Sequence, residues 1–234
     1  MNLRLLTELY KFPDPWTIDE PIIAIGGDLH PFRLISAYQN GLFPWYNDDE
    51  PILWWCPLTR CILHLDDLKI SKSMRQLFKK SLYQVTFDRD FESVILNCAN
   101  IRSSNRTDTW LNEEMIKSYI QVHELGLAHS VEVWDDKGDL VGGLYGLSIG
   151  RCFFGESMFH KSSNASKYGF IALVQNLKQR GFQFIDCQIY NPHLGSLGAI
   201  EISKDEFRDL FMEHINSKTL QYKWSDWEFN QLEI

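Results

Sequence analysis

Residues 129–158 read HSVEVWDDKGDLVGGLYGLSIGRCFFGESM, and this stretch decides the fold class. Residues 129–134 and 140–149 are rich in β-branched, aromatic and other apolar side chains, and the turn sequence DDKG separates them at 135–138. Two such runs joined by a short polar turn with a glycine predict an antiparallel hairpin. A third strand is predicted over residues 152–158. The segment therefore predicts strands that follow one another directly along the chain.

Helices are predicted on both sides of these strands, because capping residues precede segments with helical start and stop signals. The predicted helices cover residues 71–80, 90–99, 112–125, 164–181 and 203–214, with Ser71, Asp90, Asn112, Asn164 and Ser203 as N-terminal caps. Ser203 and Glu206 also have the spacing of a capping box. Further strands are predicted at 83–87 and 182–188. Strands interleaved with helices indicate a mixed α/β fold.

The first 60 residues have a different texture, since they hold seven of the eight prolines and four of the eight tryptophans. Proline favours turns and extended pieces and is tolerated in a helix only in the first turn. One helix is predicted here, from Pro31 to Asn40, with Gly41 just past its end. We therefore expect a small N-terminal domain over residues 1–62 and a larger domain over residues 63–234.

The composition is that of a packed globular chain, with 234 residues of which 44% are apolar and 14% aromatic. No apolar stretch approaches the about 20 residues that a membrane-spanning helix needs, and the first residues lack the pattern of a secretory signal. Five cysteines, an odd number without a Cys-x-x-Cys pair, predict reduced thiols. We expect a cytoplasmic monomer that does not bind membranes.

The formal net charge of −8 repels nucleic acid on average, so only a local basic patch suits a polyanion. One cluster around a single predicted helix is explained equally by solvation and by phosphate contact. Its members are Lys69, Lys72, Arg75, Lys79 and Lys80. Four tryptophans leave a similar choice between a place in the core and stacking on an exposed nucleobase. They are Trp45, Trp54, Trp55 and Trp110.

Three familiar motifs fail on their spacing. His123 and His129 are six residues apart, on different faces of a helix, so a zinc site is not predicted. Residues 155–159 lack the second glycine of a serine-hydrolase elbow. Residues 142–146 lack the Gly-Lys-Ser/Thr ending of a phosphate loop, and glycines inside a strand indicate a bulge or a close backbone approach. The sequence therefore predicts no metal, no cofactor and no enzyme nucleophile.

Polar side chains within apolar strands are the strongest candidates for a site. Asp186 and Gln188 end the strand at 182–188, two residues apart and so expected on one face. They either line a crevice or cap the turn that follows. Glu156 lies in another apolar strand, where an unpaired carboxylate is costly. Glu156 therefore needs a partner or a cationic ligand.

Several strings together resemble the leucyl/phenylalanyl-tRNA protein transferases of bacteria. In chain order they are GGDL (26–29), AYQNGLFPW (37–45), PILWW (51–55), HELG (123–126), VGGLYG (141–146), FGESMF (154–159), NASK (164–167) and IDCQ (185–188). The resemblance implies a small N-terminal domain joined to a domain with the acyl-CoA N-acyltransferase fold. It also implies transfer of leucine, phenylalanine and, less well, methionine from aminoacyl-tRNA to proteins with N-terminal arginine or lysine. Such products are marked for degradation.

The resemblance places Asp186 and Gln188 at the acceptor amine, with Glu156 close to them. Asp186 would act electrostatically or as a base, and a proton relay through the terminal ribose of the tRNA stays open as an alternative. Gln188 would position the amine, because an amide is too weak a base to take its proton. Glu156 would orient this pair or answer the positive charge of the acceptor.

The resemblance also implies a donor site. The positions that match its apolar pocket are Leu144, Phe153, Leu173 and Ile185, those near the terminal adenosine are Trp45 and Trp110, and those near the tRNA acceptor arm are Arg75, Lys79 and Lys80. The family more often has methionine at 144 and phenylalanine at 173, so the two leucines leave the preference between leucine and phenylalanine open. Two other functions stay open: an acyltransferase of the same fold with another donor, and a non-catalytic tRNA-binding adaptor.

Overall fold

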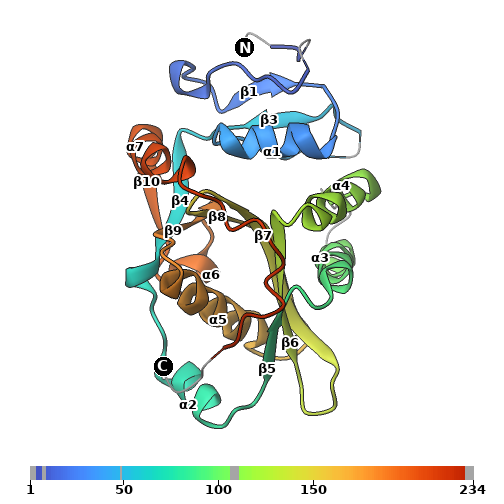
Figure 1. Cartoon of the computed structure of the whole chain (residues 1–234), viewed down its shortest axis with the longest axis vertical. Helices are drawn as coiled ribbons and strands as arrows, with labels where there is room; N and C mark the ends of the chain where they lie inside the picture. Colours follow the sequence, from blue (N-terminus) through green and yellow to red (C-terminus); the bar gives the residue numbers. More distant parts are fainter. Residues whose placement is uncertain (1–3, 7–8, 48, 106–110, 230–234) are drawn as a thin grey trace.

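A seven-stranded sheet forms the centre of the computed structural model, which describes residues 4–6, 9–47, 49–105 and 111–229, without the side chains of 101–105 (Figure 1). The strand order is β10-β4-β9-β8-β7-β6-β5. The strands are β4 (Thr59–His64), β5 (Gln84–Phe87), β6 (Ala128–Trp134), β7 (Leu140–Ile149), β8 (Cys152–His160), β9 (Phe184–Gln188) and β10 (Ile200–Ser203). The mixed α/β class is thus confirmed, and so is the hairpin, because β6 and β7 pair antiparallel.

The pair β8–β9 is parallel, whereas the other neighbours in this sheet are antiparallel. Its register runs from Cys152↔Phe184 to Phe154↔Asp186 and stops there, although β8 continues to His160 and β9 to Gln188. The two strands therefore part after Phe154. Space between the carboxyl ends of separating parallel strands is a common place for a ligand.

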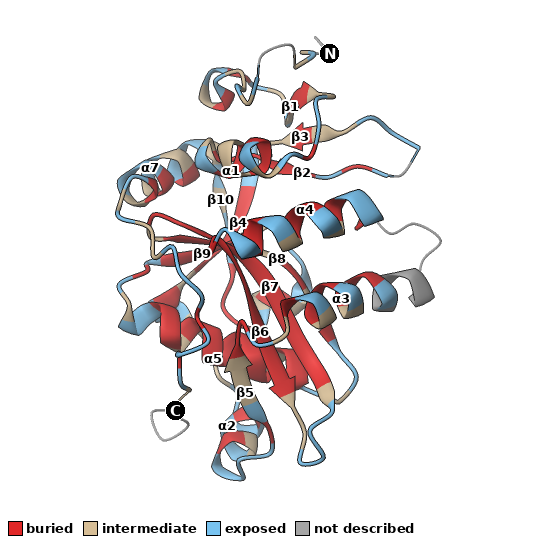
Figure 2. Cartoon of the chain, turned by 45° about the vertical axis from the view of Figure 1, so that its right-hand side comes forward, coloured by how far each residue is buried: buried red, intermediate tan, exposed pale blue. Residues whose placement is uncertain are grey.

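Helices cover both faces of the sheet (Figure 1). The longer helices are α2 (Lys72–Lys79), α3 (Phe91–Asn105), α4 (Glu113–Glu124), α5 (Ala165–Gln179) and α7 (Lys204–Ile215), and α6 (Pro192–Gly195) is a single turn. Figure 2 shows the central strands buried, while the outer sides of α3 and α4 are exposed. The sheet is therefore the middle layer of three.

Glycines in β7 let both helix layers come close. A Cβ added to Gly142 would lie 2.6 Å from the Cβ of Ala165 in α5, and one added to Gly143 would lie 3.3 Å from the side chain of Val94 in α3. Successive strand residues point to opposite faces, so each glycine serves one layer. The register of β7 also shifts just before Gly146. Both predictions for these glycines, a bulge and a close approach, are confirmed.

The N-terminal region forms a three-stranded sheet, order β1-β3-β2, with one helix beside it. Its elements are η1 (Pro15–Thr17), β1 (Ile22–Ile25), α1 (Pro31–Gln39), β2 (Phe43–Pro44) and β3 (Leu53–Trp55), and η2 (Leu65–Asp67) follows β4. One hydrophobic cluster joins both regions, since Tyr38 and Trp54 share it with Phe154. The expected domain boundary after residue 62 falls inside β4, and the chain passes from the small sheet to the large one over residues 56–58.

Most predicted helix starts are confirmed. The side chains of Ser71 and Asn112 accept backbone hydrogen bonds, and Ser203 with Glu206 forms the capping box. Asn164 precedes α5, but the predicted side-chain cap is wrong, because its left-handed backbone (φ +65°) is not the extended conformation that a capping side chain needs. The predicted end of α3 is also short, since the helix continues past Ala99 to Asn105.

The last described segment, residues 217–229, contains neither helix nor strand and returns from α7 across the sheet to end beside α2 (Figure 1). We call it the C-terminal strap. All five cysteines are free and buried, which confirms the prediction of reduced thiols. Among the helices of the described residues, none has the length and apolar character to cross a membrane.

Candidate active site

A cavity of about 550 Å³ opens where β8 and β9 part. The N-terminal region contributes one wall through residues 43–45, and β7, β8, α5 and the chain after β9 form the others. The volume is in the range of pockets that enclose small ligands. The site therefore lies between the two regions of the molecule.

The inner wall of the cavity is apolar. Leu144, Phe153, Leu173 and Ile185, the residues expected to hold the donor side chain, all line it. Each is at most 3% exposed. An aliphatic or benzyl group bound here loses no hydrogen bond, whereas a polar side chain would leave its groups unpaired. The wall can therefore select by size and polarity together.

Gln188 is the polar group at the end of β9 that lines the cavity. Its backbone has φ +61°, in the left-handed region. Its Nε2 donates a 2.7 Å hydrogen bond to Oε1 of Glu156, and its backbone N–H donates to Oδ1 of Asp186 at 2.9 Å. The side chain and backbone of Gln188 are therefore fixed by two different carboxylates.

Asp186 lies behind the cavity and does not line it. The prediction that Asp186 and Gln188 share one polar face is wrong, because the left-handed backbone of Gln188 breaks the alternation of the strand. Both Asp186 oxygens accept from Arg60, with Nε–Oδ1 at 2.8 Å and Nη2–Oδ2 at 2.6 Å. The two side chains are 0% and 1% exposed. Such bidentate contacts are the strong form of this pair.

Arg60 is held on its flat sides as well as at its edge. Its guanidinium carbon lies 4.7 Å from the ring centre of Phe43 and 4.6 Å from that of Phe207. Burial lowers the pKa of Arg60 and the charge of Asp186 raises it, and the net direction is upward. Arg60 therefore keeps its positive charge beside Asp186, and neither residue lines the cavity.

Glu156 belongs to a different kind of cluster. Its Oε1 is 2.7 Å from the hydroxyl of Tyr38, its Oε2 is 3.0 Å from the hydroxyl of Tyr119, and the two hydroxyls are 2.7 Å apart. Tyr38 comes from α1, Tyr119 from α4 and Glu156 from β8. This triangle joins the N-terminal region, helix α4 and the central sheet, and it borders the cavity through Glu156.

The triangle has three oxygen–oxygen contacts but only two hydroxyl hydrogens. A third hydrogen is available only when Glu156 is protonated. Burial raises the pKa of Glu156 to about 7, although the hydrogen bonds from Tyr38, Tyr119 and Gln188 lower it. Burial also raises the pKa values of both tyrosines well above their usual range, so they keep their protons. Glu156 is therefore a carboxyl group that titrates near neutral pH, with no cation paired to it among the described residues.

Exposed apolar groups form the rim of the cavity. Trp45, Ile189 and Tyr190 line it and are 42%, 43% and 44% exposed. Trp54 instead is fully buried and donates its Nε1–H to the carbonyl of Gly26, so it belongs to the core. Trp110, the second residue expected near the adenosine, lies outside the described residues. A flat ligand can therefore stack on Trp45, but not on Trp54.

The predicted basic residues lie away from the cavity. Arg75, Lys79 and Lys80 are exposed on α2 or at its end, and none lines the cavity. The apolar side of α2 packs on α5, with the rings of Phe78 and Tyr168 stacked at 3.9 Å. These cations can therefore reach a long ligand that extends beyond the cavity, but not a group held inside it.

Sequence reasoning assigned no role to Arg60, Tyr38 or Tyr119. Arg60 carries a signal, because a single arginine stands before the apolar run at 61–63 and such a charge needs a buried partner. The tyrosines carry none, since an aromatic residue on a helix is equally typical of the core. Their contact with Glu156 depends on the packing of helices that are far apart in the sequence.

Two family models match the chain. The model described as leucyl/phenylalanyl-tRNA protein transferase matches residues 62–212. The model of the N-terminal domain of the same transferase matches residues 27–58. Together they cover both regions that form the walls of the cavity.

Curated relatives carry the same description. A leucyl/phenylalanyl-tRNA–protein transferase of Thermodesulfovibrio yellowstonii is 50% identical over 232 residues, covering 98% of this chain and 94% of the relative. One of Syntrophus aciditrophicus is 49% identical over 213 residues, covering 91% and 89%. Among solved structures, FemX aligns with a TM-score of 0.50 and 8% identity over 77% of this chain and 71% of FemX, which is a likeness of fold.

Proposed function

The chain belongs to the leucyl/phenylalanyl-tRNA protein transferase family, and we propose that it moves leucine, phenylalanine and, less well, methionine from tRNA to proteins that begin with arginine or lysine. It is an aminoacyltransferase with an acyltransferase-like fold. The observation that carries the proposal is a cavity with an apolar inner wall beside which Gln188 and Glu156 are joined by a hydrogen bond. We further propose that it acts as a cytoplasmic monomer and that its products enter regulated proteolysis.

The donor needs little chemical activation. An aminoacyl ester is already reactive towards amines, so catalysis consists of holding the amine against the carbonyl and stabilising the developing oxyanion. The wall of Leu144, Phe153, Leu173 and Ile185 supports a role in holding the donor side chain. One methylene in such a pocket changes binding by about 1–3 kcal/mol, which agrees with acceptance of several apolar donors.

Gln188 is assigned to the acceptor amine. Its Nε2 points to Glu156, which leaves the amide oxygen to accept a hydrogen bond from the α-amino group. This contact aims the nitrogen lone pair at the ester carbonyl. The new C–N bond then forms as the ester C–O bond breaks, and the proton lost by the nitrogen goes to the leaving ribose oxygen.

The two carboxylates are assigned different duties. Asp186 acts as a positioning residue, because it holds the backbone of Gln188 and is neutralised by Arg60. Glu156 borders the cavity and has no cation of its own, so it answers the positive charge of the acceptor and takes a proton from its ammonium form. An α-amino group has an ordinary pKa of about 8, near enough to that of Glu156 for such a transfer.

The body of the tRNA is assigned to the outside of the molecule. Trp45 on the rim suits stacking on the terminal adenine. A contact of Trp110 with the same adenosine is proposed on the family resemblance alone. Arg75, Lys79 and Lys80 suit contacts with acceptor-arm phosphates. Since these cations are few, tRNA binding should weaken with salt along a shallow slope. A flat response to salt would remove this role of α2.

The test mixes the purified chain with radiolabelled leucyl-tRNA and a peptide that begins with arginine, without ATP. Label should reach the peptide, and an acetylated peptide should stay unlabelled. Transfer only from an acyl-CoA would indicate a different donor, and tight tRNA binding without transfer would indicate an adaptor.

Two matched variants locate the site. Gln188→Ala should lower transfer about 100-fold, because it removes the group that orients the amine. Gln183→Ala makes the same change at an exposed position just before β9, at the other end of that strand, and should leave transfer unchanged. Equal activity of the two variants would remove Gln188 from the mechanism.

A further inference from the structure

The C-terminal strap, residues 217–229, lies beyond the range 62–212 that the family model matches. Three hydrogen bonds join it to the rest of the fold. Thr219 Oγ1 accepts from the backbone of Gly150 at 2.9 Å, Gln221 Nε2 donates to the carbonyl of Leu125 at 3.1 Å, and the backbone of Trp224 donates to Asp88 at 2.6 Å. These hydrogen bonds fix the course of a segment that contains neither helix nor strand.

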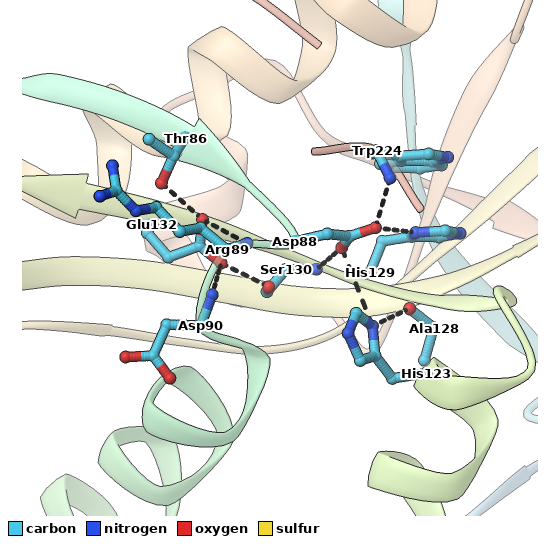
Figure 3. A network of polar contacts seen from close by, with 10 residues as sticks. All are labelled: Thr86, Asp88, Arg89, Asp90, His123, Ala128, His129, Ser130, Glu132 and Trp224. Carbon is cyan, nitrogen blue, oxygen red and sulfur yellow. Dashed lines mark hydrogen bonds and ion pairs between the residues drawn. The ribbon is translucent and has the colours of Figure 1, made fainter. Parts of the chain in front are cut away.

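Asp88 is the anchor of this path. It is buried at the end of β5 and also accepts from the backbone of Ser130 at 2.9 Å and contacts Nδ1 of His129 at 2.8 Å (Figure 3). The hydrogen bonds from His129, Trp224 and Ser130 outweigh burial and lower the pKa of Asp88. The carboxylate therefore joins the strap to β6.

Trp224 lies in a column of flat groups. Its ring stacks on His129 at 3.6 Å with an interplanar angle of 2°, and on Trp227 at 3.8 Å with an angle of 10°. Arg180 lies 3.9 Å above Trp227 on the far side. Trp224 is 0% exposed. Its position is therefore fixed from both faces of the ring as well as by its backbone.

The ring of Trp224 reaches the back of the donor pocket. Its centre is 5.9 Å from that of Phe153, which lines the cavity. The same hydrophobic cluster contains Trp224 and the other three pocket residues, Leu144, Leu173 and Ile185. Trp224 does not itself line the cavity. It supports the pocket wall from behind.

We propose that Trp224 sets the depth of the donor pocket by holding the ring of Phe153 forward, and so sets the preference between leucine and phenylalanine. In a densely packed interior, removal of a large side chain leaves a cavity, and the neighbouring side chains move partly into it. Without the indole, Phe153 can move back, the pocket deepens, and the contacts around a leucyl group are lost while a benzyl group gains room. Trp224 is a positioning residue, and the inference rests on the transferase function proposed above.

The test measures kcat and KM for leucyl-tRNA and phenylalanyl-tRNA with Trp224→Ala. The variant should raise KM for leucyl-tRNA about tenfold and KM for phenylalanyl-tRNA much less, with kcat within about twofold for both. Trp224→Phe keeps an aromatic ring behind Phe153 and should restore most of the original ratio. It also carries the test if the alanine variant does not fold, because its ratio must then still shift, by a smaller amount, in favour of phenylalanyl-tRNA.

The control variant is Phe229→Ala, at the end of the same strap. The ring of Phe229 packs on the rings of Phe78 and Tyr168, and none of these three residues lines the cavity. This variant should lower the melting temperature but leave the ratio of the two donors unchanged. An unchanged ratio in the Trp224 variants, or an equal change in Phe229→Ala, would overturn the inference. Failure of the unchanged chain to transfer either donor would instead overturn the proposed function.

Discussion

Asp186 and Glu156 stand on the neighbouring strands β9 and β8, and both are buried, yet the chain gives only one of them a cation. Asp186 faces the guanidinium of Arg60 through two short hydrogen bonds. Glu156 faces two tyrosine hydroxyls and one amide, all neutral. The first carboxylate is compensated within the fold. The second is compensated only by holding a proton or by meeting a cationic ligand.

The two carboxylates therefore differ in what they can do: one stabilises the fold, and the other can interact with a substrate. A buried carboxylate with a complete ion pair has nothing left to offer a substrate, however close it lies in the sequence to the site. A buried carboxylate among neutral donors keeps its charge available, and its pKa near 7 lets it change state under ordinary conditions. Gln188 is hydrogen-bonded to both carboxylates, so it connects the Arg60–Asp186 ion pair to the carboxyl group that titrates.

The largest effect is expected from Arg60→Leu, which leaves Asp186 charged and unpaired in the core. Breaking a buried pair from one side costs about 3–5 kcal/mol of unfolding free energy. Denaturant titration measures this loss. Asp186→Leu combined with Arg60→Leu should recover much of it, because no charge then stays unpaired. Lys117→Ala, which breaks an exposed pair with Glu113, is the control and should leave the transition midpoint unchanged. A similar loss in the single and double Arg60 variants would show that packing, and not charge, dominates.

The next effect is a pH dependence that comes from Glu156. Its pKa is about 7 in the folded chain, against an ordinary value of 4.5 for the unfolded chain, so the folded chain keeps a proton that the unfolded chain releases. This stabilisation is complete below pH 4.5 and is lost as the pH rises through 7. Glu156→Gln cannot titrate. The unfolding free energy of the original chain should therefore fall by about 3 kcal/mol relative to that of Glu156→Gln between pH 4.5 and 7. If the difference in unfolding free energy between the two chains stays constant over this pH range, the pKa of Glu156 is not raised in the folded chain.

A smaller effect concerns the acceptor. Glu156→Gln keeps the volume of the side chain but removes the charge that we propose interacts with a basic N-terminus. Above pH 7 we expect KM for a peptide that begins with arginine to rise about tenfold, which is about 1.4 kcal/mol. KM for leucyl-tRNA should not change, because the apolar wall, and not Glu156, is proposed to hold the donor side chain. Equal changes in both KM values would mean that Glu156 shapes the whole cavity.

Local patterns predicted much of this fold, and their failures are local as well. The hairpin and the caps at Ser71, Asn112 and Ser203 depend on residues near one another in the sequence, and they are confirmed. The same-face rule for Asp186 and Gln188 failed because it assumes an extended backbone. Asp186 and Glu156 look alike as polar residues in apolar strands, and only contacts across the fold separate them. Arg60 is 126 positions from Asp186, and Tyr38 is 118 from Glu156.

The smallest effect we predict comes from Tyr38→Phe, which removes one hydroxyl from the triangle around Glu156. Of the hydrogen bonds that lower the pKa of Glu156, the one from Tyr38 is the largest, and at 2.7 Å it is shorter than the 3.0 Å bond from Tyr119. Loss of this donor should raise the pKa of Glu156 above 7 and lower the unfolding free energy by about 1 kcal/mol. A carbon-13 titration of the labelled carboxyl group measures the first effect, and the pH profile of transfer should move upward with it. Tyr119→Phe should act in the same direction but less strongly. If Tyr38→Phe instead lowers the pKa, the hydroxyl of Tyr38 accepts the proton of Glu156 more than it donates to the carboxylate, and the charge of Glu156 depends on the phenol as an acceptor.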